Sequence, residues 1–228
     1  QKKDSTVSFA EFDSLLIFNI INFKSSDIIK QIMLTNCINW ELEKQNIILY
    51  EKYLTQLESN INKAYLIKPL KDNYKKVKED LINPEISSKA ILDSIKTSDV
   101  NEIFTSILSK HKNKVLYIDC WGPWCGSCIS EMPHSKKLMK KFEGEEIEFI
   151  FLCIDSEKDK WKAMLSELQI GGTHYCLTKA ESSALRKILG ISGVPHYLLI
   201  SKNGNIIKQG IDIRPSSGLA ESEIQKLL

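Results

Sequence analysis

The sequence predicts an α/β protein in which an all-helical N-terminal domain precedes a central mixed sheet flanked by helices. Three observations lead to this fold class. The first 121 of the 228 residues contain no glycine, and all ten glycines lie at or beyond Gly122. From Val115 onward, apolar runs typical of strands alternate with helical patterns. Two cysteines, Cys125 and Cys128, stand at the junction between one such strand and the helix that follows.

The glycine-free stretch favours helices, because glycine is among the least favourable residues in a helix interior. Long patterns of Lys, Glu, Leu and Ile predict helices at residues 9–23, 26–35, 41–66 and 70–82, the last lying between Pro69 and Pro84, and one or two more within residues 87–109. We therefore expect residues 1–99 to form the helical N-terminal domain and residues 100–228 the sheet domain.

The second half alternates between the two kinds of element. In chain order we expect a strand at 115–120, a helix from about residue 126, a strand at 147–154, a helix at 158–168, a strand at 175–177, a helix at 182–189, strands at 197–200 and 206–207, and a helix at 219–228. Gly190 supplies a helix C-cap, and Asn203-Gly204 supplies a tight hairpin turn. This order predicts a mixed sheet with helices on both faces.

Cys125 and Cys128 carry the chemistry of the chain. At a helix N-terminus, unpaired backbone N–H groups and the positive end of the helix dipole favour thiolate over thiol. The thiolate is the attacking species in disulfide exchange, and a second sulfur one helical turn away can attack the resulting mixed disulfide. We therefore expect Cys125 to be the nucleophile and Cys128 the resolving thiol of a redox-active disulfide.

The same spacing occurs in half of a zinc site, which needs two further Cys or His ligands. No second pair is present, because the other cysteines are single and the histidines form no H-x3-5-H pattern; they are Cys37, Cys120, Cys153, Cys176, His111, His134, His174 and His196. We expect no metal and no cofactor. Inert thiols are the expectation for the four single cysteines, and Cys176 leaves open a third redox thiol that would pass the disulfide onward.

Three short motifs follow one another in a specific order. They are Ile118-Asp119-Cys120-Trp121-Gly122-Pro123-Trp124-Cys125-Gly126-Ser127-Cys128, then Glu131-Met132-Pro133, then Gly193-Val194-Pro195 before an apolar strand. In these motifs the chain from about residue 100 to 228 resembles the TlpA/ResA-like thiol-disulfide oxidoreductases. The resemblance implies a thioredoxin-like fold and protein thiol-disulfide oxidoreductase activity, in the direction of a reductant of envelope proteins. It says little about the first hundred residues.

The resemblance also implies roles for two carboxylates. Asp119 matches a buried carboxylate beneath the disulfide that relays a proton to or from the resolving cysteine, and burial would raise its pKa. The alternative is a strand-end aspartate that faces water. Glu131 matches an acidic residue characteristic of the TlpA/ResA-like group, and its alternative is a solvated glutamate in the first part of a helix.

Substrate contacts are implied by a second set of positions. Pro195 resembles the cis-proline that faces the Cys-x-x-Cys, where the backbone of the preceding Val194 pairs with a bound substrate strand; a trans proline opening a strand is the alternative. Trp124 is expected to cover the apolar side of the disulfide. His196 replaces a threonine common in thioredoxins, and it either tunes the redox pair or binds metal, or is a partly exposed histidine at a strand start.

Two rival functions stay open. A thiol peroxidase of the same superfamily resembles a Thr-x-x-Cys arrangement, whereas Trp124 stands directly before Cys125 here. A copper-binding module could use Cys125, Cys128 and His196, since soft thiolates select Cu(I). The copper proteins of this fold resemble a Cys-x-x-x-Cys spacing, which this chain lacks.

Charge and N-terminal sequence bear on partners and location. The net charge of +2 is spread over both halves, so neither a nucleic-acid surface nor an anionic-membrane surface is indicated. The apolar run 14–23 is too short to span a bilayer and follows Asp4, Glu11 and Asp13. The chain starts at Gln1 without a signal-peptide layout, so we expect that an N-terminal segment has been removed.

The family resemblance implies that the removed segment was an export signal or a lipid anchor. It therefore implies a periplasmic or cell-envelope location, with membrane contact only through that anchor. The expected partners are protein disulfide and dithiol substrates and an upstream membrane electron donor.

Overall fold

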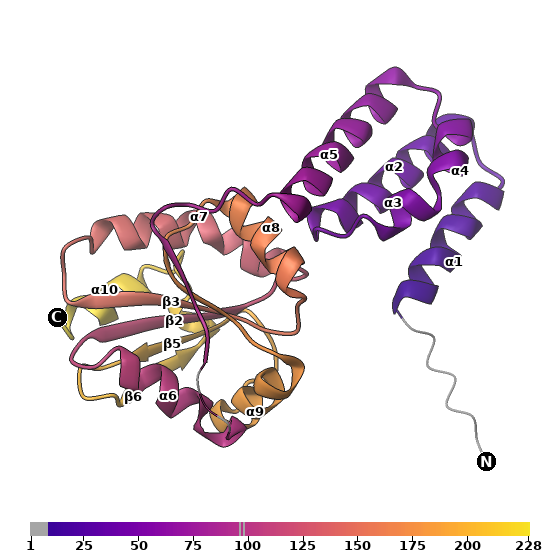
Figure 1. The fold of residues 1–228 in the computed structure, drawn as a ribbon. Helices are drawn as coiled ribbons and strands as arrows, with labels where there is room; N and C mark the ends of the chain where they lie inside the picture. The colour runs from indigo at the N-terminus through magenta and orange to yellow at the C-terminus, as the bar shows by residue number, and fades with distance from the viewer. Residues whose placement is uncertain (1–8, 96, 98) are drawn as a thin grey trace, which may run out of the picture. The chain divides into compact units, whose positions relative to one another are not determined.

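The computed structural model describes residues 9–95, 97 and 99–228, so Gln1, Asp4, Lys96 and Ser98 lie outside the described residues. The chain divides into two compact units, Gln1–Asn83 and Pro84–Leu228 (Figure 1). This division lies earlier than the expected one at 99/100, because a strand formed by residues 90–93 pairs with the sheet of the second unit. Each unit has its own apolar core.

The first unit is helical, as predicted. Its helices are α1 (Phe9–Asn22), α2 (Asp27–Glu43), α3 (Ile48–Lys52), α4 (Leu54–Asn60) and α5 (Ala64–Ile82). Ile17 and Ile20 of α1 are buried against residues of the other helices, which makes α1 a packing helix. Throughout the described part of the chain, helices are either too short or too polar to cross a bilayer.

The single helix expected at 41–66 is wrong, because the helix is interrupted at Tyr53 and the chain turns at residues 44–47 and again at residues 61–63. At the first turn Gln45 has a left-handed backbone (φ 59°) and the Asn46 side-chain amide donates to the Glu41 carboxylate at 2.6 Å. At the second turn the buried Gln31 amide oxygen accepts from the backbone N–H groups of Asn62 and Lys63, both at 3.0 Å. The Asn46 side-chain oxygen also accepts from the Ile48 backbone N–H at 3.3 Å, so at both turns polar side chains bind backbone groups that a continuous helix would use.

The helix α5 also differs from the expectation that Pro69 opens it. It begins at Ala64, and Pro69 lies inside it. The predicted end near Pro84 agrees with the structure, in which the helix stops at Ile82.

The second unit is built on a six-stranded sheet. Its strands are β1 (Ala90–Asp93), β2 (Val115–Trp121), β3 (Ile147–Cys153), β4 (Gly172–Cys176), β5 (His196–Ile200) and β6 (Ile206–Gly210), in the spatial order β1-β4-β3-β2-β5-β6. The pairs β1–β4, β4–β3 and β3–β2 are parallel, whereas the pairs β2–β5 and β5–β6 are antiparallel. The mixed sheet is therefore as predicted.

Helices cover both faces of this sheet (Figure 1). They are α6 (Ile103–Lys110), α7 (Gly126–Lys141), α8 (Lys158–Leu168), α9 (Lys179–Leu189) and α10 (Leu219–Gln225), with short 3₁₀ turns η1 (Val100–Glu102) and η2 (Ile211–Ile213). Residues of α7, α8 and α10 pack on one face and residues of α6 and α9 on the other. Because side chains alternate along a strand, β2 contributes Tyr117 and Trp121 to the first face, and Ile118 and Cys120 to the second.

The strand β1 was missed. Residues 87–109 were expected to be helical, which α6 confirms only for their last part. Ala90–Asp93 instead pair in parallel with β4, and the Gly172 N–H donates to the Lys89 carbonyl at 3.1 Å. A four-residue edge strand with exposed Ile91 and Leu92 has no alternating burial pattern that sequence periodicity could reveal.

Candidate active site

The candidate active site lies where β2 ends and α7 begins. All seven residues of β2 are buried, and the chain then turns through Gly122 and Pro123 before the helix. The Cys125 N–H donates to the Gly122 carbonyl at 3.0 Å, which closes this turn. A Cβ atom on Gly122 would lie 2.6 Å from the indole nitrogen of Trp124, so a larger residue at this turn would displace the indole.

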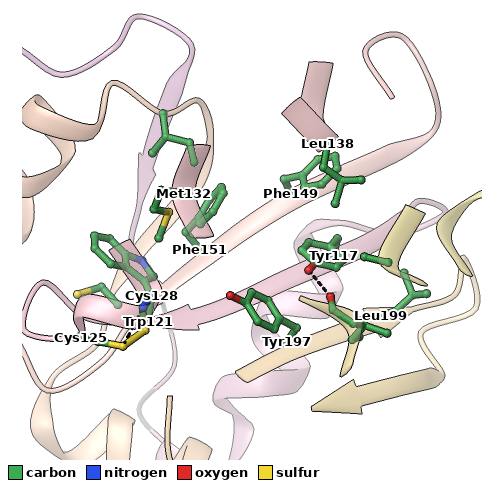
Figure 2. Packing of buried hydrophobic residues seen from close by; sticks show 14 of the residues in the cluster. Tyr117, Trp121, Cys125, Cys128, Met132, Leu138, Phe149, Phe151, Tyr197 and Leu199 are labelled. Atoms are coloured by element: carbon green, nitrogen blue, oxygen red, sulfur yellow. Dashed lines mark hydrogen bonds between the residues drawn. A yellow bond between two sulfur atoms is a disulfide. The ribbon is translucent and has the colours of Figure 1, made fainter. Parts of the chain in front are cut away.

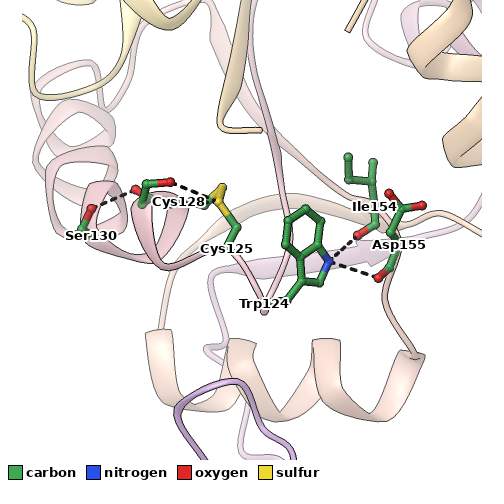
Figure 3. The surroundings of a disulfide bond; sticks show 7 residues. Trp124, Cys125, Cys128, Ser130, Ile154 and Asp155 are labelled. Carbon is green, nitrogen blue, oxygen red and sulfur yellow. Dashed lines mark hydrogen bonds between the residues drawn. A yellow bond between two sulfur atoms is a disulfide. The ribbon is translucent and has the colours of Figure 1, made fainter. Parts of the chain in front are cut away.

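Cys125 is the N-cap of α7 and forms a disulfide with Cys128 (Figure 3). The backbone N–H of Cys128 donates to the Cys125 sulfur at 3.2 Å. The exposed fraction is 5% for Cys125 and 0% for Cys128. A helix N-terminal N–H directed at the first sulfur favours its thiolate after reduction, and the second sulfur is the more enclosed of the two.

Asp119 lies in the middle of the buried strand, with 1% of its surface exposed. Neither carboxylate oxygen has a hydrogen-bond partner among the described residues. Burial raises the pKa of this carboxyl well above its usual range, and the charge of Glu131 raises it further. A carboxyl of raised pKa on the disulfide-bearing face of the sheet holds a proton more readily than an ordinary aspartate, so it can exchange one with a nearby thiol.

Glu131 is half-buried on α7 and is fixed by a loop far away in the sequence. Its carboxylate accepts from the Ser216 hydroxyl at 2.8 Å and from the Ser216 backbone N–H at 3.0 Å. It is therefore neither a free solvated side chain nor a group in direct contact with the sulfurs. Its charge acts on Asp119 through space.

Sequence reasoning missed Tyr197, which is the register partner of Asp119 across β2 and β5. Its buried hydroxyl has no hydrogen-bond partner among the described residues. Figure 2 shows this hydroxyl directed toward the part of the core that holds Trp121 and Cys128. The neighbouring Tyr117 ring stacks on the Tyr197 ring, with 5.9 Å between the ring centres. Unlike the Tyr197 hydroxyl, the Tyr117 hydroxyl is hydrogen-bonded, because it donates to the Ile213 carbonyl at 2.6 Å.

Trp124 is 41% exposed, and its indole N–H donates to the carbonyls of Asp155 at 3.1 Å and Ile154 at 3.4 Å. Figure 3 shows the indole directed to this segment after β3, on the other side of Cys125 from the helix. Trp121, in contrast, is fully buried in the core.

The peptide bond between Val194 and Pro195 is cis. Val194 packs against the core cluster that contains Cys125 and Cys128. His196 opens β5 opposite Cys120, on the face of the sheet away from the disulfide. Burial lowers the pKa of His196, and a hydrogen bond with the Gln209 side chain offsets part of this effect by raising it.

The single cysteines differ from one another in the structure. Cys120 is buried in the face of the sheet covered by α6 and α9, where burial raises its pKa. Cys153 and Cys176, which sequence spacing did not pair, lie directly opposite each other on β3 and β4. In the described part of the chain, no group of three or more His, Cys, Asp or Glu side chains is arranged to hold a metal ion.

Comparison with known proteins agrees with this arrangement. The family model described as Redoxin matches residues 88–228. The thiol-disulfide oxidoreductase ResA of Bacillus thuringiensis subsp. konkukian is 26% identical over 102 residues, which cover 45% of this chain and 57% of that protein. Nucleoredoxin of Bos taurus is 30% identical over 91 residues, covering 40% of this chain and 20% of that protein.

Among solved structures, a candidate thiol-disulfide oxidoreductase from Bacteroides vulgatus is 32% identical, with a TM-score of 0.48, over 53% of this chain and 83% of that one. The chain spans little more than half the length of the ResA proteins that it matches. The Redoxin match covers more than half of the chain and includes every motif that suggested the resemblance. The chain therefore belongs to the Redoxin family, as a TlpA/ResA-like protein with a thioredoxin-like fold.

Proposed function

We propose that the protein is a thiol-disulfide oxidoreductase that exchanges disulfides with other proteins through Cys125 and Cys128. The observation that carries this proposal is the Cys125–Cys128 disulfide at the N-terminus of α7, with the Cys128 N–H on the Cys125 sulfur. The names of the ResA relatives support the reaction class. No comparable observation favours peroxidase or copper-binding activity.

As a reductant, the reduced pair acts in two steps. The Cys125 thiolate attacks one sulfur of a substrate disulfide, forming a mixed disulfide and releasing the other substrate sulfur as a thiolate that takes a proton. Cys128 then loses its proton to ionised Asp119 and attacks the Cys125 sulfur. The second substrate sulfur leaves as a thiolate that takes a proton, and the Cys125–Cys128 disulfide remains. The buried Asp119 carboxyl, free of hydrogen bonds to the described residues, supports its role as the proton acceptor.

Substrate binding is assigned to the exposed rim of this site. Val194 and Pro195 precede β5 and would present the backbone to an extended substrate strand, and Trp124 would contact it from the other side of Cys125. Main-chain pairing with an extended peptide tolerates many sequences, which suits exchange with several protein partners. Glu131 sets the charge near Asp119.

The direction and location belong to the same proposal. We infer a reductant of proteins in the periplasm or cell envelope, regenerated by a membrane electron donor, with no nucleic-acid partner. The direction is what the resemblance to the TlpA/ResA-like group implies, and the net charge of +2 indicates no nucleic-acid surface.

The test is the reduction potential of the pair, measured by equilibration in dithiothreitol buffers. A value near that of thioredoxin, about −270 mV or lower, would support a reductant, whereas a value near −120 mV would make the protein an oxidant. Cys125→Ala must abolish the couple. Cys120→Ala, which removes a thiol from the other face of the same region of the sheet, must leave it intact. The absence of any couple at Cys125–Cys128 would overturn the proposed function.

A further inference from the structure

A second pair of cysteines stands at the ends of two neighbouring strands. Cys153 is the last residue of β3 and Cys176 the last of β4, and the two are register partners in the parallel ladder. Both side chains lie on the face of the sheet covered by α7 and α8. Neighbouring strands are about 4.7–4.9 Å apart. This spacing falls within the Cα separation of about 4.4–6.8 Å that disulfides span.

The two thiols already interact in the reduced state. Each side chain acts on the pKa of the other, and the Cys176 sulfur lies 3.9 Å from the Ser156 carbonyl. As register partners on neighbouring strands, with both side chains on one face, the two cysteines stand close enough for a disulfide without a change of strand pairing.

Burial and charge make the pair asymmetric. Cys153 is fully buried, and burial raises its pKa. Cys176 is half-exposed, and its pKa is lowered first by the hydrogen bond from Cys153 and then by the charge of Lys158, against burial and Glu181. An accessible sulfur with thiolate character beside an enclosed thiol is the arrangement of a nucleophile with its resolving partner.

We propose that Cys153 and Cys176 form a second redox-active dithiol, separate from Cys125 and Cys128, which is oxidised to a disulfide by small disulfide compounds. The Cys176 thiolate attacks one sulfur of the compound, whose other half leaves as a thiolate and takes a proton. Cys153 then gives up its proton and attacks the Cys176 sulfur, so that the second half leaves as a thiol. One disulfide is reduced to two thiols while two protein thiols become one disulfide.

This second pair adjoins the Cys125–Cys128 site through one short segment. The carbonyls of Ile154 and Asp155, which follow Cys153 directly, accept from the Trp124 indole, and the next carbonyl, of Ser156, faces Cys176. Closing the second disulfide therefore acts on the residues that hold Trp124. We expect a change in Trp124 fluorescence when the pair closes.

The test uses the full chain carrying Cys125→Ser and Cys128→Ser, so that its outcome does not depend on the proposed function. The fully reduced protein is treated with oxidised glutathione, quenched by alkylation and mapped by mass spectrometry. The expected product has lost two hydrogens, carries no glutathione and contains a peptide pair linked through Cys153 and Cys176. A product in which Cys176 keeps glutathione while Cys153 stays alkylatable would overturn the proposal.

Two further variants in the same background test the assigned roles. Cys153→Ala is expected to stop at a stable glutathione adduct on Cys176, because the resolving thiol is missing. Cys176→Ala is expected to slow consumption of oxidised glutathione at least about tenfold, because a buried thiol with a raised pKa remains. Cys120→Ala serves as the matched control and must leave the rate and the product unchanged. Equal rates in the parent and Cys176→Ala, with native circular dichroism in both, would contradict the assignment.

Discussion

Glu131 and Ser216 are joined by two hydrogen bonds, from the Ser216 hydroxyl at 2.8 Å and its backbone N–H at 3.0 Å. They tie α7, three residues beyond Cys128, to the loop between η2 and α10. These bonds hold the Glu131 charge in place. Burial is the main cause of the raised pKa of Asp119, and this charge raises it further.

Glu131→Gln is expected to lower the pKa of Asp119, because it removes the negative charge and leaves burial in place. Ser216→Ala keeps the charge and should therefore lower this pKa less. Both values can be read from the carboxyl carbon resonance of ¹³C-labelled Asp119 as a function of pH. If the two variants shift the titration equally, the Glu131 charge is not the cause.

Asp119→Asn is expected to stabilise the protein at alkaline pH. A carboxyl whose pKa is raised in the folded state binds more protons there than in the unfolded state, so stability falls as pH rises through the folded pKa. Asparagine cannot ionise, so the extra stability of the Asp119→Asn variant over the original protein should be absent below about pH 4 and grow with pH. Urea unfolding at several pH values measures the difference.

The same Asp119→Asn change should slow disulfide exchange. Positioned acid-base groups contribute about 10²- to 10⁴-fold to rate, so we expect a loss of about 10²-fold. Asp93→Asn is the matched control, because Asp93 lies on the edge strand β1 and its carboxylate is paired with Lys110 at 2.7 Å. A rate unaffected by Asp119→Asn would remove Asp119 from the mechanism.

The buried His174 side chain is expected to make the protein less stable on acidification. Burial lowers its pKa to about 4, against hydrogen bonds to the backbone of Gly171 and Ile170. In the unfolded state His174 has a pKa near 6.5, so below that pH the unfolded state binds more protons than the folded state. The folded protein therefore has its full stability above about pH 6.5 and loses stability as the pH falls toward 4. Between pH 7.5 and 5.0 we expect a loss of about 2 kcal/mol.

His174→Phe should remove that loss, because the ring no longer titrates. Phenylalanine can keep the stacking on Phe151, whose ring centre lies 4.7 Å from that of His174. The measurement is urea unfolding of both proteins at the two pH values. An identical pH dependence in the variant would show that other groups cause the acid loss.

Gly122→Ala is expected to displace the Trp124 indole. The added Cβ would lie 2.6 Å from the indole nitrogen and 3.2 Å from the Ile154 carbonyl oxygen. We expect a destabilisation of about 1–3 kcal/mol and faster alkylation of reduced Cys125. Gly193→Ala is the control, since a Cβ there meets no atom within 4 Å. Equal effects of the two changes would argue against this contact.

Truncation tests the boundary between the two units. Residues 84–228 contain every strand of the sheet, whereas residues 100–228 lack β1 and expose the edge of β4. The shorter fragment should melt at least about 4 °C lower, because it loses the backbone hydrogen bonds of that strand pair. Thermal unfolding followed by circular dichroism compares them. Equal melting temperatures would favour the boundary at 99/100.

Much of the fold could be predicted because it follows from local patterns. The Lys158–Leu168 helix and the turn at Asn203-Gly204 were predicted from periodicity and turn residues within a few positions. The errors fall where local signals are weak or compete. The four residues of β1 are exposed or half-exposed, and the breaks near Gln45 and Asn62 depend on side chains that bond to the backbone.

The sequence by itself determined the strand, the Cys-x-x-Cys pair and the helix of the candidate site, because these are consecutive and their chemistry depends on a helix N-terminus. Only the tertiary structure brought Ser216 to Glu131, Tyr197 opposite Asp119 and Cys176 opposite Cys153. Such pairs depend on strand order and register, and a shift of one residue would turn each side chain to the other face of the sheet. Residue spacing does not encode that choice, which the packing of both faces of the sheet decides.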